Sequence, residues 1–427
     1  MTAMVDSVGQ KGYRTTSVAD VIGRAGVSRE TFYAHFANKQ ECFLATYDVV
    51  WTQSRRRVAR AYREAEGWPG RAQAAIAALF EAAIENPGAV RLATVEIGAL
   101  GPAGIERREQ SVAEYERFIA DAVELAPGEG RISETAARAV VGGLYRILDR
   151  RVSSGEHAEL LELVPDLVTW ATSYYPTPPA VAESQRGRAP TRAGLEGGRA
   201  PGTLAPHSTL RGRRGLARGN QNVSRSFVVH SQCERILDAV ANLTAKEGYA
   251  ALNVNDIATE AAISLGAFYE HFADKEDAFL AAYELGHAKG LALVKRAYAA
   301  QADWRQGVKA ALGALLGYLA SEPSFAHLAL IETLSATRRT SDRFYAGIGA
   351  YAQTILPRFE EARKRSGAPA IAIEATTGGL FELCLHHAMG NRIHELPELT
   401  SDATYIALAP FIGAEEAARV ATASSAL

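Results

Sequence analysis

The residues that follow Ser28 and Ser264 carry very different hydrogen-bonding chemistry. Arg29-Glu30-Thr31 offers a guanidinium, a carboxylate and a hydroxyl, whereas Leu265-Gly266-Ala267 offers no side-chain hydrogen bond. An arginine can pair with guanine through two hydrogen bonds, worth about 1–3 kcal/mol of discrimination, while an apolar group can only touch the methyl group of thymine. If both segments face DNA, they read it with unequal stringency.

The residues around Arg29 predict a helix, a tight turn and a second helix. Ser17 and Asp20 have the spacing of a capping box at the start of the helix that precedes the turn. Gly26 suits a tight turn, and Ser28 suits the N-cap of the helix that follows. Two helices joined by a short turn with glycine are the helix-turn-helix signature.

The chain repeats itself at an offset of 236 residues. Tyr13 falls on Tyr249 and Trp68 on Trp304, and the register continues without a gap to the GGL triplets at 142–144 and 378–380. This period is far too long for a solenoid. The ungapped register therefore indicates tandem duplication of a whole unit.

The second copy keeps the cap chemistry of the first with different residues. Asn253, Ser264 and Asp274 precede its three predicted helices, and each side chain can accept a hydrogen bond from a free N–H group of a helix start. Frequent alanine favours helix over strand throughout. Both copies are therefore expected to form the same all-α fold.

Composition restricts the class of protein. The 427 residues suffice for two or three domains, and the net charge of −2 means that any nucleic-acid site must be a local patch. Three scattered cysteines, no signal sequence and no apolar run of membrane length predict a cytoplasmic protein without a membrane partner. With no phosphate loop, nucleophile elbow or paired metal motif, we expect neither an enzyme nor a cofactor.

Two segments, AGVSRETFYAHFANKQECF and AAISLGAFYEHFADKEDAF, resemble the DNA-binding signature of the tetracycline-repressor (TetR) family. The resemblance covers about 45 residues in each copy. It implies two TetR-like units in tandem, each with an N-terminal helix-turn-helix domain and a C-terminal helical domain that binds ligand and dimerises. It also implies a repressor that binds an operator in double-stranded DNA and is released by a small-molecule effector.

The predicted domains follow this scheme. Residues 1–47 and 227–283 are the helix-turn-helix domains, and residues 48–175 and 284–420 are the effector and dimerisation domains. Residues 176–226, rich in Arg, Gly and Pro, are a disordered linker. This linker is either a passive spacer or a basic arm that follows DNA phosphates.

The resemblance also implies the residues that meet DNA. They are Ser17, Ser28, Arg29, Thr31, Tyr33, His35 and Lys39 in the first copy, and Asn253, Ser264, Leu265, Ala267, Tyr269, His271 and Lys275 in the second. The two histidines have a structural alternative. Because the triplets differ, we predict an operator with unlike half-sites; the alternative is an interaction or ligand-sensing protein whose second head is degenerate.

The start of the first copy differs from that of the second. Its first helix begins at Met1, and it lacks the equivalent of residues 231–236. Either the N-terminus is short or the true start lies upstream. A short N-terminus is expected to weaken the phosphate contacts of this copy.

The sequence contains little information about the identity of the effector. Glu96 and Glu332 are repeated carboxylates in apolar helical runs, so they either bind an effector or form a buried polar contact. The candidate pocket aromatics are Tyr115, Tyr145, Phe344, Tyr345 and Phe381, with core packing as their alternative. A metal site at His386 and His387 is disfavoured, because the register places arginines opposite them.

Glycines inside a helix cost about 1 kcal/mol each relative to alanine, so the repeated GGL triplets suggest close helix packing. This packing is either between the copies, as in the dimer interface of the resembling family, or within each copy. A flexible linker of about 50 residues spans near 40 Å, and half-sites one turn apart need about 34–36 Å. The chain can therefore form an intramolecular pseudo-dimer, alone or within a further homo-oligomer.

Overall fold

The computed structural model describes residues 1–124, 132–181 and 225–423. Throughout these ranges the ordered elements are helices, and no strand is found. The all-α fold predicted from the sequence is confirmed.

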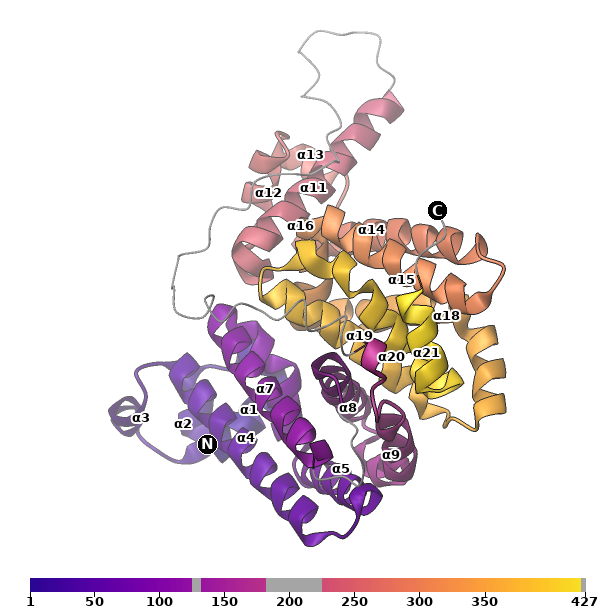
Figure 1. Cartoon of the computed structure of the whole chain (residues 1–427). Coiled ribbons are helices and arrows are strands. Elements are labelled where there is room, and N and C mark those ends of the chain that lie inside the picture. The colour runs from indigo at the N-terminus through magenta and orange to yellow at the C-terminus, as the bar shows by residue number, and fades with distance from the viewer. Residues whose placement is uncertain (125–131, 182–224, 424–427) are drawn as a thin grey trace. The chain divides into compact units, whose positions relative to one another are not determined.

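The chain divides into two compact units, whose elements are labelled in Figure 1. Unit 1 comprises Met1–Pro178, Ala352–Met389 and Asp402–Leu427, and unit 2 comprises Pro179–Tyr351 and Gly390–Ser401. The units do not coincide with the two copies. Unit 1 contains the first copy together with the last long helices of the second.

The helices of the first copy follow the predicted order of a small head and a larger body. They are α1 (Thr2–Thr15), α2 (Val18–Ala25), α3 (Arg29–His35), α4 (Lys39–Glu64), α5 (Trp68–Glu85), α6 (Pro87–Thr94), η1 (Glu96–Leu100), α7 (Pro102–Glu124), α8 (Glu134–Ser154), η2 (His157–Leu163) and α9 (Val164–Thr172).

The second copy repeats this order at the same offset. Its elements are α11 (Arg225–Ala251), α12 (Val254–Glu260), α13 (Leu265–Tyr269), α14 (Lys275–Ala299), α15 (Trp304–Ser321), α16 (Pro323–His327), η4 (Leu328–Glu332), α17 (Thr333–Ala336), α18 (Arg338–Ser366), α19 (Ile371–Met389), η5 (Ile393–Leu399), α20 (Thr400–Ile412) and α21 (Ala414–Thr422).

Side-chain caps begin the head helices where the sequence predicts them. The Ser17 hydroxyl accepts a hydrogen bond from the backbone N–H of Asp20, and the Asp20 carboxylate accepts one from the N–H of Ser17, which completes the capping box. Asn253 caps α12, and Ser28 and Ser264 cap α3 and α13. The helix-turn-helix is therefore fixed locally in both copies.

Each head surrounds its own cluster of aromatic side chains. Phe32 and Phe43 are at most 4% exposed in the first head, and Phe268 and Phe279 are fully buried in the second. Burial of a side chain of this size contributes about 1.5–3 kcal/mol. The recognition helices are therefore held through their inner faces.

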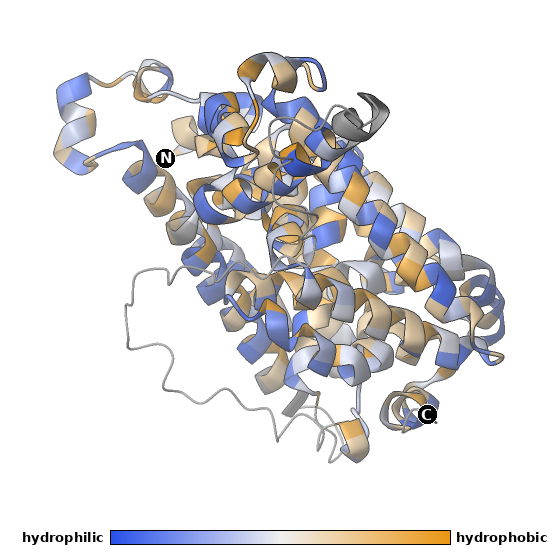
Figure 2. Ribbon diagram, turned by 90° about the horizontal axis from the view of Figure 1, so that it is seen from above, coloured by the Kyte–Doolittle hydropathy of each residue, from blue (hydrophilic) through white to orange (hydrophobic). Residues whose placement is uncertain are grey.

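Hydrophobic and hydrophilic residues alternate along most long helices (Figure 2), as expected of helices with one face in a core. Among the described residues, no single helix is both long and apolar enough to cross a membrane. Two bent helix pairs, at 304–332 and 357–389, meet that test by length and composition only when their members are taken together.

Continuous helices cross the predicted boundaries between head and body. Helix α4 runs unbroken through residue 47, and α14 runs unbroken through residue 283. Neither helix contains proline, so nothing local ends it at the boundary. Each head is therefore joined to its body by one continuous helix.

The packed chain extends beyond residue 176, where the sequence predicts the linker to begin. The Thr177 hydroxyl accepts a hydrogen bond from the N–H of Ser133 and donates one to the carbonyl oxygen of Tyr174. At the other end, α11 already begins at Arg225. Residues 182–224, which carry most of the predicted basic arm, lie outside the described residues.

The turn of each head contains a residue with left-handed backbone angles. In the first copy this residue is Gly26, with a φ of 66°. In the second it is Ala262, with a φ of 52°. Because the Cβ of alanine is crowded in this conformation, the second turn carries strain that the first avoids.

We expect Ala262→Gly to raise the free energy of unfolding of the second head, and Gly26→Ala to lower that of the first, each by about 1 kcal/mol. Crowding by neighbours is not the cause at Gly26, because a Cβ there would meet no atom within 4 Å. Urea unfolding of the full chain, read by hydrogen exchange of each head, measures both changes. Shifts of the same sign in the two variants would contradict this explanation.

Candidate functional site

Helices α3 and α13 present the predicted reading residues to solvent. Arg29, Thr31 and Tyr33 are exposed on α3, with Tyr33 at 49%. On α13, Leu265 is 44% exposed and Tyr269 is 58% exposed. Large exposed side chains on short helices with buried inner faces form a surface that is ready to contact another molecule.

The two heads differ in the chemistry of this surface, as the sequence predicts. The first offers the Arg29 guanidinium, and the Thr31 hydroxyl lies 2.9 Å from that of Ser28. The second offers Leu265 and the half-buried Ala267, which have only apolar side chains. The geometry therefore preserves the difference in hydrogen-bonding capacity between the heads.

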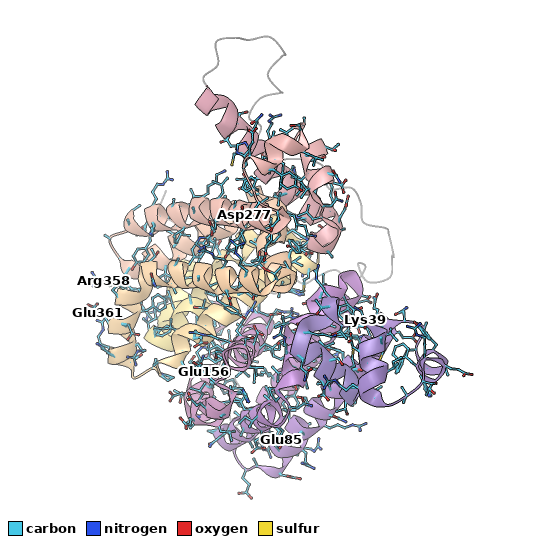
Figure 3. All side chains as sticks on the ribbon, turned by 180° about the vertical axis from the view of Figure 1, so that it is seen from behind. Lys39, Glu85, Glu156, Asp277, Arg358 and Glu361 are labelled. Carbon is cyan, nitrogen blue, oxygen red and sulfur yellow. The ribbon has the colours of Figure 1, made fainter. Side chains whose placement is uncertain are left out.

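The lysines at equivalent positions of the two heads, Lys39 and Lys275, are engaged inside the protein. Lys39 Nζ, at the start of α4, lies 2.8 Å from the carbonyl oxygens of both Tyr13 and Thr16 (Figure 3). Lys275 Nζ likewise donates to the carbonyl oxygens of Tyr249 and Leu252. Each lysine thus fastens the end of the first helix to the start of the fourth, and burial lowers the pKa of Lys39. A phosphate contact from these lysines stays a prediction.

The two histidines have different environments. His35 is exposed at the end of α3, and His271 lies 3.4 Å from the amide oxygen of Gln232 on α11. The contact with Gln232 supports the structural alternative for His271.

Glu96 and Glu332 perform the same structural task in the two copies. Glu96 Oε2 accepts a hydrogen bond of 2.7 Å from the N–H of Tyr13, and Glu332 Oε2 accepts one of 2.9 Å from the N–H of Tyr249. Both N–H groups follow a glycine with a φ near 80°, where the first helix of the head is broken. Each carboxylate thus ties the body to the head, which supports the buried polar contact over an effector contact.

An apolar cavity lies in the body of the first copy. Its volume is about 100 Å³, and it is lined by side chains of α4, α5, α7, α8 and α9. Tyr115 and Tyr145, both predicted as pocket aromatics, line it together with Phe118 and Val141. Burial raises the pKa of Tyr115 to about 12, so its hydroxyl stays protonated.

The other predicted pocket residues lie elsewhere. Phe381 is buried on α19, where the Arg146 guanidinium lies 4.1 Å from its ring centre. Tyr345 packs edge-on against Phe344 on α18. Together with Glu96 and Glu332, these residues are absent from the lining of the cavity. The residues predicted to form one ligand pocket therefore lie in different places: two line the cavity, the two glutamates contact a head, and the others pack on helices.

The GGL glycines lie where α8 and α19 cross inside unit 1 (Figure 1). A Cβ atom on Gly143 would lie 2.6 Å from the carbonyl oxygen of Ala375, and one on Gly379 would lie 2.7 Å from that of Ala139. Such distances leave no room for a larger residue. The glycines thus serve packing between the copies, which is the interface alternative predicted from the sequence.

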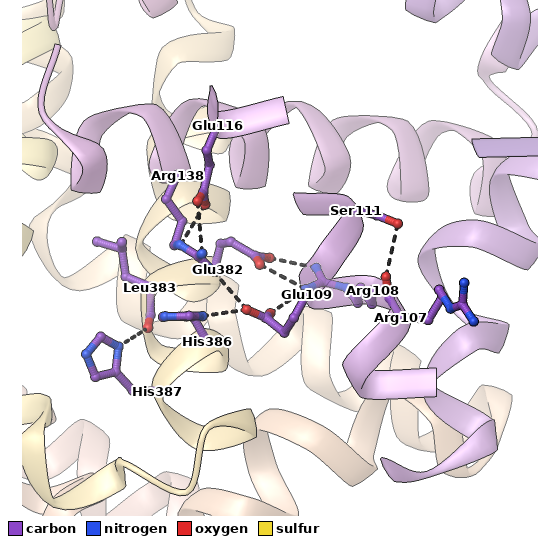
Figure 4. Close-up of polar contacts among 10 residues, drawn as sticks. All are labelled: Arg107, Arg108, Glu109, Ser111, Glu116, Arg138, Glu382, Leu383, His386 and His387. Atoms are coloured by element: carbon purple, nitrogen blue, oxygen red, sulfur yellow. Dashed lines mark hydrogen bonds and ion pairs between the residues drawn. The ribbon is translucent and has the colours of Figure 1, made fainter. Parts of the chain in front are cut away.

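A network of buried charges accompanies this crossing (Figure 4). Arg108 forms two hydrogen bonds, of 2.9 and 2.7 Å, to the carboxylate of Glu382, and these side chains are 9% and 2% exposed. His386 Nδ1 lies 2.5 Å from Glu109 Oε2. Burial alone would raise the pKa of Glu382, but the nearby Arg108 charge outweighs it and the pKa lies below its usual value. The sequence contained no signal for the Arg108 contact.

The pKa values of two further carboxylates of this network are shifted in opposite directions. Burial raises the pKa of Glu116 to about 7, although Arg138 lies beside it. Burial also acts on Glu109, but its hydrogen bond to His386 helps to lower its pKa to about 2. No group of His, Cys, Asp or Glu residues that could hold a metal ion occurs in the part of the chain that the structure describes.

Residues 3–46 and 236–282 both match the bacterial regulatory proteins of the tetR family. The likeness to this family is thus shown for these two segments of the chain. The two matched segments are the heads described above, from the first helix to the start of the fourth. The duplication inferred from the offset is thereby confirmed.

A curated relative matches over one head. Across 51 residues the chain is 49% identical to YerO, an HTH-type transcriptional regulator of Bacillus subtilis (strain 168). The match covers 12% of this chain and 18% of the relative. The chain therefore spans about a fifth of the length of the curated relative it matches.

Solved structures of bacterial regulators are similar to part of this chain at low identity. The fatty acid degradation regulator FadR of Bacillus halodurans is 18% identical, with 42% of this chain and 97% of that chain covered and a TM-score of 0.37. FadR of Bacillus subtilis in complex with stearoyl-CoA is 15% identical, with the same coverage and TM-score. We assign no effector from these likenesses.

We expect Glu96→Ala to lower the free energy of unfolding by about 1–3 kcal/mol, because it leaves the N–H of Tyr13 without its acceptor. Glu106→Ala, which removes an exposed carboxylate of α7, is the matched control and should change it by less than about 0.5 kcal/mol. Thermal and urea unfolding of the full chain measure both. Equal effects of the two substitutions would contradict the head-to-body contact.

Proposed function

We propose that the chain is a transcriptional repressor that binds operator DNA as an intramolecular pseudo-dimer and is released by a small apolar effector. The observation that carries the proposal is the pair of exposed and chemically unlike helices, α3 and α13, in two heads of the tetR family. Helices at this position of a helix-turn-helix read the major groove. The operator then has two unlike half-sites, and the first head reads its half more stringently.

Two features support pairing within one chain. Helices α8 and α19 come from different copies and pack in one compact unit. The two heads also belong to the same chain, so their effective concentration does not fall on dilution. In this arrangement a single chain supplies both heads to one operator.

The proposed release mechanism depends on α4. This helix carries Lys39 at the head end, and Val58 and Tyr62 in the wall of the apolar cavity. The cavity of about 100 Å³ is smaller than the cavity of about 150 Å³ that admits benzene in an engineered protein. A larger ligand must therefore displace the walls, and displacement of α4 moves the head. Such a ligand weakens DNA binding by favouring the displaced state.

A second candidate function is an interaction protein with a degenerate second head. The observation that favours it is the apolar Leu265-Gly266-Ala267 surface of α13, which has no side-chain donor or acceptor. In that case α13 makes no base contact, and operator binding depends on the first head alone. The experiment below separates this function from the first.

We expect Arg29→Ala to weaken binding to the DNA upstream of the protein's own gene about 10- to 100-fold, because a bidentate guanine contact is lost. Leu265→Ala should weaken it less than about fivefold, through lost thymine contact. Gel shifts and footprinting measure both, with the exposed α4 residue Arg56→Ala as the control. A symmetric footprint with equal losses from both heads would contradict the asymmetric operator. No loss from Leu265→Ala or Tyr269→Ala would favour the degenerate second head.

The cavity is tested with n-alkanols of increasing chain length as probes. We expect them to raise the melting temperature of the full chain and to weaken its DNA binding, because they bind the folded state. Ala75→Phe, which fills the cavity wall, should abolish both effects, whereas Leu161→Phe at an exposed site should retain them. A response that survives in Ala75→Phe would place the effector site elsewhere.

A further inference from the structure

The glycine crossing of α8 and α19 is reciprocal, but its charges are not. Gly142 packs against the side chain of Glu382, and Gly378 packs against the side chain of Arg146. At the offset of 236 residues these two contacts are counterparts, which is the geometry of an isologous interface. One position of this interface therefore holds a cation in the first copy and an anion in the second.

The buried partner of Glu382 continues the asymmetry. Arg108 supplies it from α7 of the first copy, with both side chains nearly inaccessible to solvent. The counterpart of Arg108 in the second copy is Phe344. Arg108 therefore meets the carboxylate of Glu382. At the two equivalent positions the sequence has Phe344 and Arg146, which cannot form an ion pair.

A second charged contact follows the same rule. Arg150 and Arg151, at the end of α8, both lie 3.2 Å from the carboxylate of Glu374 on α19. The counterpart of Glu374 in the first copy is Arg138. Again the first copy contributes the cations and the second contributes the anion.

We propose that this interface allows a first copy to pair only with a second copy. The α7–α8 surface of the first copy is complementary to α19 of the second copy and not to another first copy. Two first copies packed in this way would place Arg108 against Arg146, and Arg150 and Arg151 against Arg138. The contact of Glu109 with His386 would instead keep opposite charges, because Arg150 is the counterpart of His386. Each clash would occur twice by symmetry. Like charges at a site that excludes water oppose such a pair strongly.

Two second copies fail for a different reason. Glu382 would meet Phe344 instead of Arg108, and a buried charge without its partner is strongly destabilising. The partner of each surface is therefore the other half of this chain, from the same molecule or from a second one. This inference deepens the intramolecular pairing proposed above and rests on it.

The experiment uses two charge reversals in the full chain, Arg108→Glu and Glu382→Arg. Each alone places like charges together and should lower the melting temperature by about 10 °C. The double variant restores an opposite pair and should recover most of the loss. An equimolar mixture of the two single variants can restore both pairs only by exchange between chains, so sedimentation should show a two-chain species in the mixture and one-chain species in each variant alone.

The matched control is the pair of Arg57 and Glu85, which also has two short hydrogen bonds, with side chains 29% and 63% exposed; Glu85 is labelled in Figure 3. Arg57→Glu and Glu85→Arg should shift the melting temperature by less than about 2 °C, and their mixture should contain no two-chain species.

Three results would overturn the proposal: single reversals as stable as the wild type, a double variant without recovery, or a mixture that sediments like its components. If the single variants fail to fold, recovery in the double variant still decides the matter. No DNA is present, so failure here differs from failure of operator binding. A wild-type chain that already sediments as a stable dimer would instead contradict the intramolecular pairing itself.

Discussion

The contact between the glycines of α8 and α19 is the constraint on which the rest of unit 1 depends. Because no side chain separates the two backbones at Gly143 and Gly379, the flanking residues are forced into close contact. Arg108 and Glu382 lose nearly all their solvent there and must satisfy each other. Close packing of the two helices therefore requires opposite charges at this place. The two copies accordingly carry different side chains where they meet.

The same unit connects this contact to the head of the first copy. Tyr145 lies on α8 and lines the apolar cavity, and the Arg108 guanidinium lies 6.0 Å from its ring centre. On the opposite wall, α4 continues without a break to the head, and Glu96 ties the body to the first helix of that head. Cavity, interface and reading surface are therefore joined by rigid helices and by short hydrogen bonds, which is the physical basis of the proposed release.

Sequence reasoning succeeded where the signal is local or repeated. The caps at Ser17 and Ser28 depend on residues three positions apart, and the glycine crossing is visible because a helix-breaking residue occurs twice at the same register. The boundary at residue 47 was an inference from family architecture, and the absence of proline and glycine from α4 is the local signal that the helix continues.

Long-range contacts without a repeated counterpart could not be predicted. Arg108 and Glu382 are 274 positions apart, and the equivalent positions hold Phe344 and Arg146, so comparison of the copies hides the pair. The contacts of Lys39 could not be predicted either, because its acceptors are backbone carbonyls, which leave no trace in the sequence. Glu96 and Glu332 stand out in the sequence as repeated carboxylates, but their partners are backbone N–H groups and could not be predicted for the same reason.

The central claim is that one chain pairs its own halves and presents two unlike heads to one operator. Native mass spectrometry of the full chain with a duplex carrying the footprinted site tests it most directly, because it counts chains per duplex. One chain per duplex, unchanged as protein is added beyond equivalence, is the predicted result. Two chains on every occupied duplex would contradict the claim.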